Sequence, residues 1–204
     1  EVGFKSSWFD NRLMVNLSAF YITIEDKQVS ELHPTIAATT ITNAAEATSK
    51  GFELQVQARP MPGLDIVGGF GYTEAKFDEF SATVWNDQGD ALTQKDYAGN
   101  YLQYAPKFTY NLSAQYKADN GIFARADLLG TGPFYGDAAN KAEQGAYMTV
   151  NFQLGYAYKS FEGRLWMRNA FDEDYRTFLV PFQQSLVGID GPPRTFGVTL
   201  SYRF

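Results

Sequence analysis

Apolar and polar side chains alternate along several long stretches of this chain. The last twelve residues, PRTFGVTLSYRF, place an apolar side chain at every second position, namely Phe196, Val198, Leu200, Tyr202 and Phe204. Successive side chains of a β-strand point to opposite faces, so this segment has one wholly apolar face. In a soluble sandwich that face packs on a second sheet, whereas in an outer-membrane barrel it contacts lipid.

The same period of two recurs upstream, with polar residues on the second face. It is longest in GFELQVQA at 51–58, YNLSAQYK at 110–117 and MTVNFQLGYAY at 148–158, and weaker examples begin at Leu13, Leu64 and Ile122. Helical spacing fits none of these segments. The pattern predicts an all-β, antiparallel fold of about nine strands with one apolar and one wet face: 1–8, 13–25, 48–59, 64–76, 101–117, 122–130, 146–158, 163–174 and 194–204.

The connections between these strands alternate in length. Tight turns rich in Gly, Pro, Asn and Asp are expected at 9–12, 60–63, 118–121 and 159–163. Between them lie long, polar stretches without a regular pattern, at 26–47, 77–100, 131–145 and 174–193. Outer-membrane barrels have short periplasmic turns and long outer loops, so the order predicts a transmembrane barrel segment with its C-terminus in the periplasm.

Nine strands do not close a bacterial single-chain barrel, which has an even number. The first residues, EVGFKSSW, already read as a strand in progress, without an initiator Met or a signal peptide. We therefore expect residues 1–204 to be the C-terminal part of a longer barrel domain whose first strands lie upstream.

Composition narrows the class of protein further. Aromatic residues make up 16% of the chain, yet no apolar run approaches the ~18 residues of a spanning helix. The absence of cysteine excludes disulfides, thiolate metal sites and cysteine nucleophiles. A net charge of −6 argues against a nucleic-acid groove, which needs clustered Lys and Arg.

Five motifs together resemble the barrel of TonB-dependent outer-membrane receptors, with siderophore receptors the nearest group. They are the opening EVGFKSSWFDNRLMVNLSAFYI, the central NAAEATSKGFELQVQARPMPGLDIVGGFGYTEAKF, then GNYLQYAPKFTYNLSAQY, RNAFDEDYR and the final RTFGVTLSYRF. The resemblance covers nearly the whole chain, in family order. It implies a barrel of about 22 strands with a plugged lumen, of which these nine would be the last.

The resemblance also implies partners. The plug domain, the remaining strands and the peptide that engages TonB would lie upstream in the same receptor. The expected ligand is a ferric chelate, and the surroundings are outer-membrane lipid and lipopolysaccharide. The apolar positions 196–204, which end on Phe204, resemble the signal read by the barrel-assembly machinery; alternatively, Phe204 only completes an aromatic girdle.

Candidate chemistry in the sequence is sparse. Asp172, Glu173 and Asp174 are consecutive and point in alternating directions, so we expect an acidic edge rather than a metal site. The glycines of VGGFGYT precede no helix that could cradle a phosphate. The single histidine, His33, has only Glu31 nearby and no nucleophile elbow, so we expect no enzyme, catalytic residue or cofactor.

Aromatic residues in the long connections are the candidate ligand contacts, because loops on a rigid scaffold commonly carry binding. The predicted set is Trp85, Tyr97, Tyr101, Tyr104, Phe178, Phe182 and Gln183. The alternative is that these side chains pack the loops together or contact lipopolysaccharide sugars.

The sequence leaves three functions open. The first is an active-transport receptor for a ferric siderophore or a similar scarce metal chelate. The second is a passive channel or surface-binding barrel, which shares the strands but needs no plug. The third is a soluble β-sandwich binding module, which would not need detergent to stay in solution.

Overall fold

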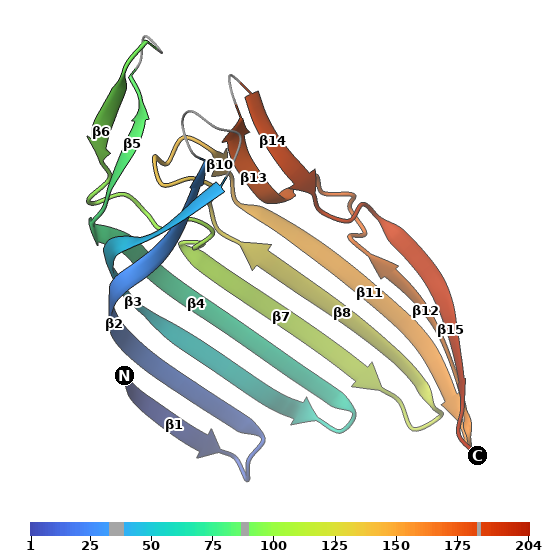
Figure 1. Cartoon of the computed structure of the whole chain (residues 1–204). Coiled ribbons are helices and arrows are strands. Elements are labelled where there is room, and N and C mark those ends of the chain that lie inside the picture. Colours follow the sequence, from blue (N-terminus) through green and yellow to red (C-terminus); the bar gives the residue numbers. More distant parts are fainter. Residues whose placement is uncertain (33–38, 87–89, 183–184) are drawn as a thin grey trace.

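The protein is an open, twisted antiparallel sheet with further strand pairs at one end (Figure 1). The computed structural model describes residues 1–32, 39–86, 90–182 and 185–204. Nine strands of this part form one sheet in chain order: β1 (Val2–Trp8), β2 (Leu13–Leu32), β3 (Thr39–Met61), β4 (Leu64–Glu79), β7 (Phe108–Lys117), β8 (Ile122–Thr131), β11 (Tyr147–Tyr158), β12 (Phe161–Arg168) and β15 (Thr195–Tyr202). The predicted antiparallel all-β fold is confirmed.

Three further antiparallel pairs lie beyond the sheet, where the long connections are (Figure 1). They are β5 (Ser81–Trp85) with β6 (Leu92–Asp96), β9 (Phe134–Tyr135) with β10 (Glu143–Gln144), and β13 (Arg176–Phe182) with β14 (Ser185–Asp190). The prediction of long connections without regular structure was therefore wrong in part. Segments outside the main sheet still have to satisfy their backbone N–H and C=O groups, and here each connection does so by pairing two of its own strands.

Several strand ends also differ from the prediction. The β2–β3 ladder runs on to the pair Leu32↔Thr39, so most of 26–47 is strand. The strand expected from 101 starts at Phe108, since Tyr104 has φ 54° and Pro106 has no N–H for a ladder. The strand expected to reach 174 stops at Arg168, since Asn169 has φ 47°. Among the described residues, no helix is long and apolar enough to cross a membrane.

Tight turns join the strands at the opposite end of the sheet (Figure 1). Two of these turns require glycine. Gly63 has φ +80° and Gly121 has φ +90°, a region that other residues rarely adopt. A Cβ at Gly63 would lie 2.3 Å from the Lys117 carbonyl oxygen, and one at Gly121 would lie 2.2 Å from that of Ala157. These two glycines let a turn pass close against the next strand.

The two faces of the sheet differ in polarity, as predicted. The apolar positions of neighbouring strands are register partners, for example Leu154, Leu165 and Val198, and all three are more than half exposed. On the opposite face Ser113, Asp127 and Asn151 are partners, and Arg125 holds the Asp127 carboxylate with N–O distances of 2.9 and 2.6 Å. We call these the apolar face and the polar face.

The apolar face forms a band of limited height. On β4 and β7 it runs from the pair Leu64↔Tyr116 to the pair Tyr72↔Phe108, nine residues per strand. At ~3.4 Å per residue and a tilt of about 40°, the band is about 22 Å tall, close to the ~25 Å of outer-membrane barrels. Aromatic side chains gather at both limits, with Tyr116, Tyr156, Tyr158, Phe161 and Tyr202 toward the short turns and Phe52, Phe70, Tyr72, Phe108 and Tyr110 toward the long connections.

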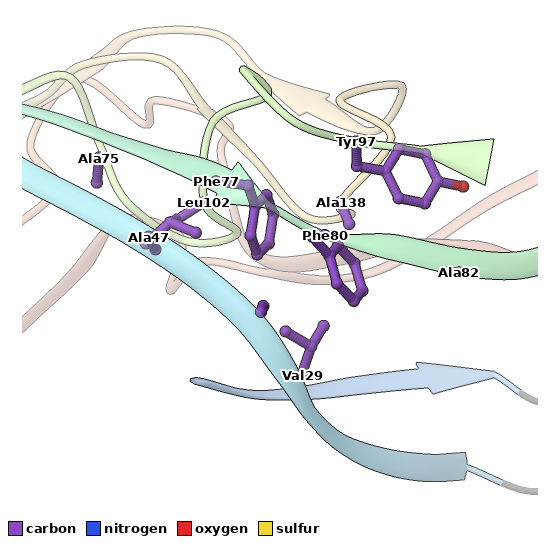
Figure 2. Packing of buried hydrophobic residues seen from close by; sticks show 10 residues of the cluster. Val29, Ala47, Ala75, Phe77, Phe80, Ala82, Tyr97, Leu102 and Ala138 are labelled. Atoms are coloured by element: carbon purple, nitrogen blue, oxygen red, sulfur yellow. The ribbon is translucent and has the colours of Figure 1, made fainter. Parts of the chain in front are cut away.

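The packed core lies outside the band, where β2, β3 and β4 run on into the long connections. Phe77 and Phe80 stack with ring centroids 4.8 Å apart, surrounded by small side chains (Figure 2). The buried members are Val29, Ala45, Ala47, Ala75, Phe77, Phe80, Ala82, Tyr97, Leu102 and Ala138. This core fixes the bases of the connections, and a second buried group, Phe134, Ala142 and Leu179, joins the β9–β10 connection to β13.

Candidate ligand-binding surface

Three aromatic rings from separate connections meet at the end of the sheet that carries the long connections. The Tyr104 ring stacks on that of Phe178 at 5.6 Å between centroids and 10° between planes, and Phe134 lies 6.0 Å from Tyr104. The Tyr104 hydroxyl donates to the carbonyl oxygen of Leu179 at 2.8 Å. We call these three rings the aromatic cluster.

Backbone contacts hold the aromatic cluster in place. The Tyr104 amide donates to the Tyr135 carbonyl at 2.8 Å, which ties the connection before β7 to β9. Gly136 then passes so close to β13 that an added Cβ would lie 1.8 Å from the Leu179 carbonyl oxygen. Leu179 and Ala142 are fully buried beneath this contact. The cluster therefore rests on packed backbone.

Burial also affects the ionisation of two tyrosines here. Desolvation raises the pKa of Tyr104. Tyr175 stacks on Tyr147 with centroids 4.2 Å apart, and its pKa is raised by burial first and by the neighbouring Tyr147 second. Both hydroxyls therefore stay neutral through physiological pH, and that of Tyr104 is already committed to the Leu179 carbonyl.

Asn169 forms the junction between β12 and the last long connection. It is 5% exposed, its side-chain amide donates to the carbonyls of Glu173 and Pro192, and its side-chain oxygen accepts the Glu173 amide. Asp172 accepts the Arg194 amide at 2.8 Å, so both ends of the connection are held together. We call this arrangement the Asn169 clasp.

The clasp gives one residue of the acidic run at 172–174 a structural role. The Asp172 carboxylate accepts the Arg194 amide and lies 3.7 Å from the Arg194 guanidinium. Within the described ranges, no group of three or more His, Asp or Glu side chains could hold a metal ion. His33 lies outside the described residues.

Tyr101 lies in a different group from the aromatic cluster. Its ring contacts two ammonium groups, with Lys76 Nζ 4.9 Å and Lys107 Nζ 4.4 Å from the centroid. The Tyr135 ring stacks beside it at 6.0 Å. Asn140 clamps the Tyr101 backbone, accepting its N–H at 2.8 Å and donating to its carbonyl at 2.9 Å.

The predicted contact residues therefore separate into groups. Tyr104 and Phe178 come together from positions far apart in sequence, and each is 40% exposed. Trp85, at the end of β5, is 45% exposed. Tyr97 is buried against Phe80, which favours its interpretation as a packing residue (Figure 2). Phe182 ends β13, its side chain is not described, and Gln183 lies outside the described residues.

Sequence reasoning did not select Phe134, Tyr135, Tyr147, Tyr175 or Asn169. The first two stand between Gly132 and Gly136, and the close approach of backbone that glycines allow was the available signal. Asn169 stands in the RNAFDEDYR motif, but nothing in the neighbouring residues shows that it would be buried.

A hollow of about 830 Å³ lies away from the aromatic cluster. It is lined mainly by the apolar face, including Leu64, Leu154, Leu165 and Val198. On the lipid-facing side of an outer-membrane barrel, such an apolar hollow would be filled by acyl chains. We therefore do not regard it as the ligand site.

Comparison with known proteins gives a consistent family. A family model described as TonB dependent receptor-like, beta-barrel, matches residues 1–170. The chain is 26% identical over 197 residues to the pesticin receptor of Yersinia pestis, covering 92% of this chain and 26% of that protein. It is 25% identical over 178 residues to the probable TonB-dependent siderophore receptor PiuA of Acinetobacter baumannii, covering 87% and 23%. This chain spans about a quarter of the length of these relatives.

Solved structures show the same fold. The ferric yersiniabactin uptake receptor FyuA from Yersinia pestis superposes with a TM-score of 0.80 at 23% identity, over 99% of this chain and 29% of that one. The siderophore receptor PiuA from Acinetobacter baumannii superposes with a TM-score of 0.78 at 22% identity, over 98% and 27%. In both, the matched region is a part of a longer receptor.

Proposed function

Since the chain belongs to the TonB-dependent receptor-like β-barrel family, we propose that it is part of an outer-membrane receptor that takes up a ferric siderophore or a similar scarce metal chelate. Residues 1–204 would form the C-terminal part of the barrel domain, of about 22 strands. The plug and the N-terminal strands would lie elsewhere in the same receptor.

One observation carries this proposal. A membrane-high apolar band is joined, at one end only of the described sheet, to packed connections that present half-exposed aromatic rings. A lipid-facing barrel with aromatic rings exposed on the connections at one end is suited to binding an organic chelate from outside the cell. The names of the relatives support it, since PiuA is described as a probable siderophore receptor and FyuA as a ferric yersiniabactin uptake receptor.

The proposed ligand contacts are the ring faces of Tyr104 and Phe178, with Trp85 and Tyr101 on neighbouring connections. Stacked rings can cover the planar or apolar parts of a chelate while its iron stays enclosed by the chelator. Phe182 and Gln183 stay predictions. Binding and release require no bond to be made or broken, in keeping with relatives that are named as receptors and not as enzymes.

The proposal includes an orientation. The long connections would face the cell exterior and Phe204 would lie on the periplasmic side. The last strand and the residues directly after it expose every second side chain, which suits their recognition by the barrel-assembly machinery before the barrel closes. They are Phe196, Val198, Leu200, Tyr202 and Phe204. TonB would act through the N-terminal part of the receptor.

Uptake measurements test this function. Cells that carry the full-length receptor should accumulate a cognate radiolabelled ferric chelate only when TonB is present, and Tyr104→Ala with Phe178→Ala should weaken chelate binding about tenfold or more if each ring contributes ~1 kcal/mol. Uptake that continues unchanged without TonB would refute active transport and would favour a passive channel.

A further inference from the structure

A group of lysines lies at the upper limit of the apolar band. Lys50 on β3 and Lys76 on β4 share the carboxylate of Glu74, with N–O distances of 3.0 and 3.3 Å. Lys76 also contacts the Tyr101 ring, and Lys107 contacts the same ring from the connection before β7. We call Lys50, Lys76, Lys107, Glu74 and Tyr101 the basic rim patch.

Sheet register shows that the patch continues the apolar face at Lys50, Glu74 and Lys76, and Lys107 joins it through the Tyr101 ring. Phe52 pairs with Tyr72 at the upper limit of the band, and two residues further along both strands Lys50 pairs with Glu74. Side chains two apart on a strand share a face, so the Lys50–Glu74 pair points the same way as the Phe52 and Tyr72 rings. Lys76 and its bridge partner Tyr101 follow on that face.

The patch therefore lies two strand residues beyond the aromatic limit of the band, on the side of the long connections. Two residues of strand advance ~7 Å along the strand, or about 5 Å in height at a tilt of 35–45°. Lipid headgroups lie at this height, directly above hydrocarbon. Long Lys side chains that start near this limit can extend to the headgroup layer.

The charge of the patch is positive although the chain as a whole carries −6. Its three ammonium groups face one carboxylate within the patch, Glu74, and a second nearby, Asp78, which accepts the Thr48 hydroxyl at 2.6 Å. Lys107 makes no ion pair in the part of the chain that the structure describes, and its ammonium group lies 4.4 Å from the Tyr101 ring centroid and 5.9 Å from that of Tyr135. The Lys50 side chain is 55% exposed.

We propose that the basic rim patch binds the phosphate groups of lipopolysaccharide in the outer leaflet. Phosphates accept charge-assisted hydrogen bonds from ammonium groups, and the acyl chains of the same lipid would cover the apolar face below. Among the envelope's anionic lipids this occupant fits best, because the patch lies at the end that the proposed function places outside. The inference rests on that orientation.

Lipid binding to the full-length receptor tests the proposal. The receptor is purified from outer membranes, delipidated in detergent and titrated with bis-phosphorylated lipid A, dephosphorylated lipid A and phosphatidylglycerol, with bound lipid counted by native mass spectrometry. We expect bis-phosphorylated lipid A to bind best. The variant Lys50→Gln/Lys76→Gln/Lys107→Gln should bind it at least about tenfold more weakly, given about fivefold per lysine near an anionic lipid.

Three further variants make the result specific. Lys5→Gln/Lys117→Gln/Lys159→Gln removes the same charge from the polar face and the short turns and should leave lipid A binding unchanged. Glu74→Gln removes the competing carboxylate and should tighten binding severalfold. Should the first triple variant not fold, Lys107→Gln alone serves, since it leaves no carboxylate without its partner.

The outcomes are distinguishable. Equal lipid A binding by the wild type and the Lys50/Lys76/Lys107 variant, or equal affinity for phosphatidylglycerol and lipid A, overturns the inference. Binding in detergent does not depend on uptake, so loss of TonB-dependent transport with intact lipid A binding would contradict the proposed function alone. Labelling that places the long connections in the periplasm would overturn the orientation and this inference with it.

Discussion

At the residue scale, ring-over-glycine pairs help to fix which residues face each other across the sheet. The Tyr110 ring covers Gly130, the Phe123 ring covers Gly155 and the Trp166 ring covers Gly197, so an added Cβ would lie 2.0, 2.2 and 2.5 Å from the respective rings. Each ring fits only where its neighbour lacks a side chain. A slip of one residue would place a side chain under the ring and turn the strand's apolar side chains to the polar face.

The Gly130→Ala substitution tests this role. The new methyl group forces Tyr110 out of position, and we expect the barrel to lose about 1–3 kcal/mol, as overpacked sites do. The measurement is the unfolding temperature of the detergent-solubilised receptor. Gly145→Ala is the control, because nothing lies within 4 Å of a Cβ there. Equal losses in both variants would contradict the pairing argument.

A second residue-scale prediction concerns Tyr104 and pH. Burial raises its folded-state pKa above the ordinary value, so folding favours the neutral hydroxyl. Its contribution to stability is complete below the unfolded pKa near 10 and is lost as pH rises through the higher folded value. The loss of stability above pH 10 should therefore be smaller in Tyr104→Phe than in the wild type, measured as unfolding temperature against pH. If the two variants lose unfolding temperature equally with rising pH, the folded-state pKa of Tyr104 is not raised.

At the element scale, the Asn169 clasp holds the β13–β14 hairpin to the end of β12. Asn169→Ala removes the partners of three backbone groups, the N–H and C=O of Glu173 and the C=O of Pro192. Both residues are exposed, so water can replace these partners and the loss is about 0.5–1.5 kcal/mol per hydrogen bond. The sheet pairs of β12 with β11 and β15 do not depend on these contacts. Loosening should therefore stay within the connection.

Limited proteolysis tests this expectation. We expect Asn169→Ala to be cut faster between 170 and 194 while its barrel unfolding temperature stays within a few degrees of the wild type. Asn120→Ala is the matched control, since Asn120 accepts a backbone hydrogen bond in a short turn at the other end. Unchanged cleavage in Asn169→Ala would show that the hairpin is held by other contacts.

The strands that cross the apolar band could be predicted from sequence, because one face contacts hydrocarbon and the other water, which imposes a period of two. The β2–β3 extension and the hairpins beyond the band could not, since no long period of two runs through them, as the apolar run 178–180 shows, and pairing there depends on the neighbouring backbone. Tyr97 and Tyr104 look alike in sequence, yet one is buried beside Phe80 and the other is stacked in the open. The different burial of the two tyrosines depends on contacts with residues distant in sequence, such as that between Tyr104 and Phe178.

At the scale of the whole molecule, the two ends of the sheet are built differently, and the proposed orientation follows from that contrast. Residues 1–204 contain no cysteine, so a cysteine introduced here is the only one in this part of the receptor and can report which side is outside. Asp90→Cys, next to β6, should react with a membrane-impermeant maleimide in intact cells. Asp119→Cys, in a short turn, should react only after permeabilisation. The reverse pattern would invert the proposed orientation.

The β5–β6 hairpin has a practical consequence for anyone working with this receptor. Its strands pair with each other, Asn86 closes their far end by accepting the amides of Asp90 and Ala91, and the Phe77, Phe80 and Tyr97 core anchors their base. A foreign peptide spliced in between Asn86 and Asp90 would thus leave the barrel wall and the aromatic cluster untouched. If the long connections face the cell exterior, as proposed, a receptor with an epitope tag in this hairpin could be stained on living bacteria.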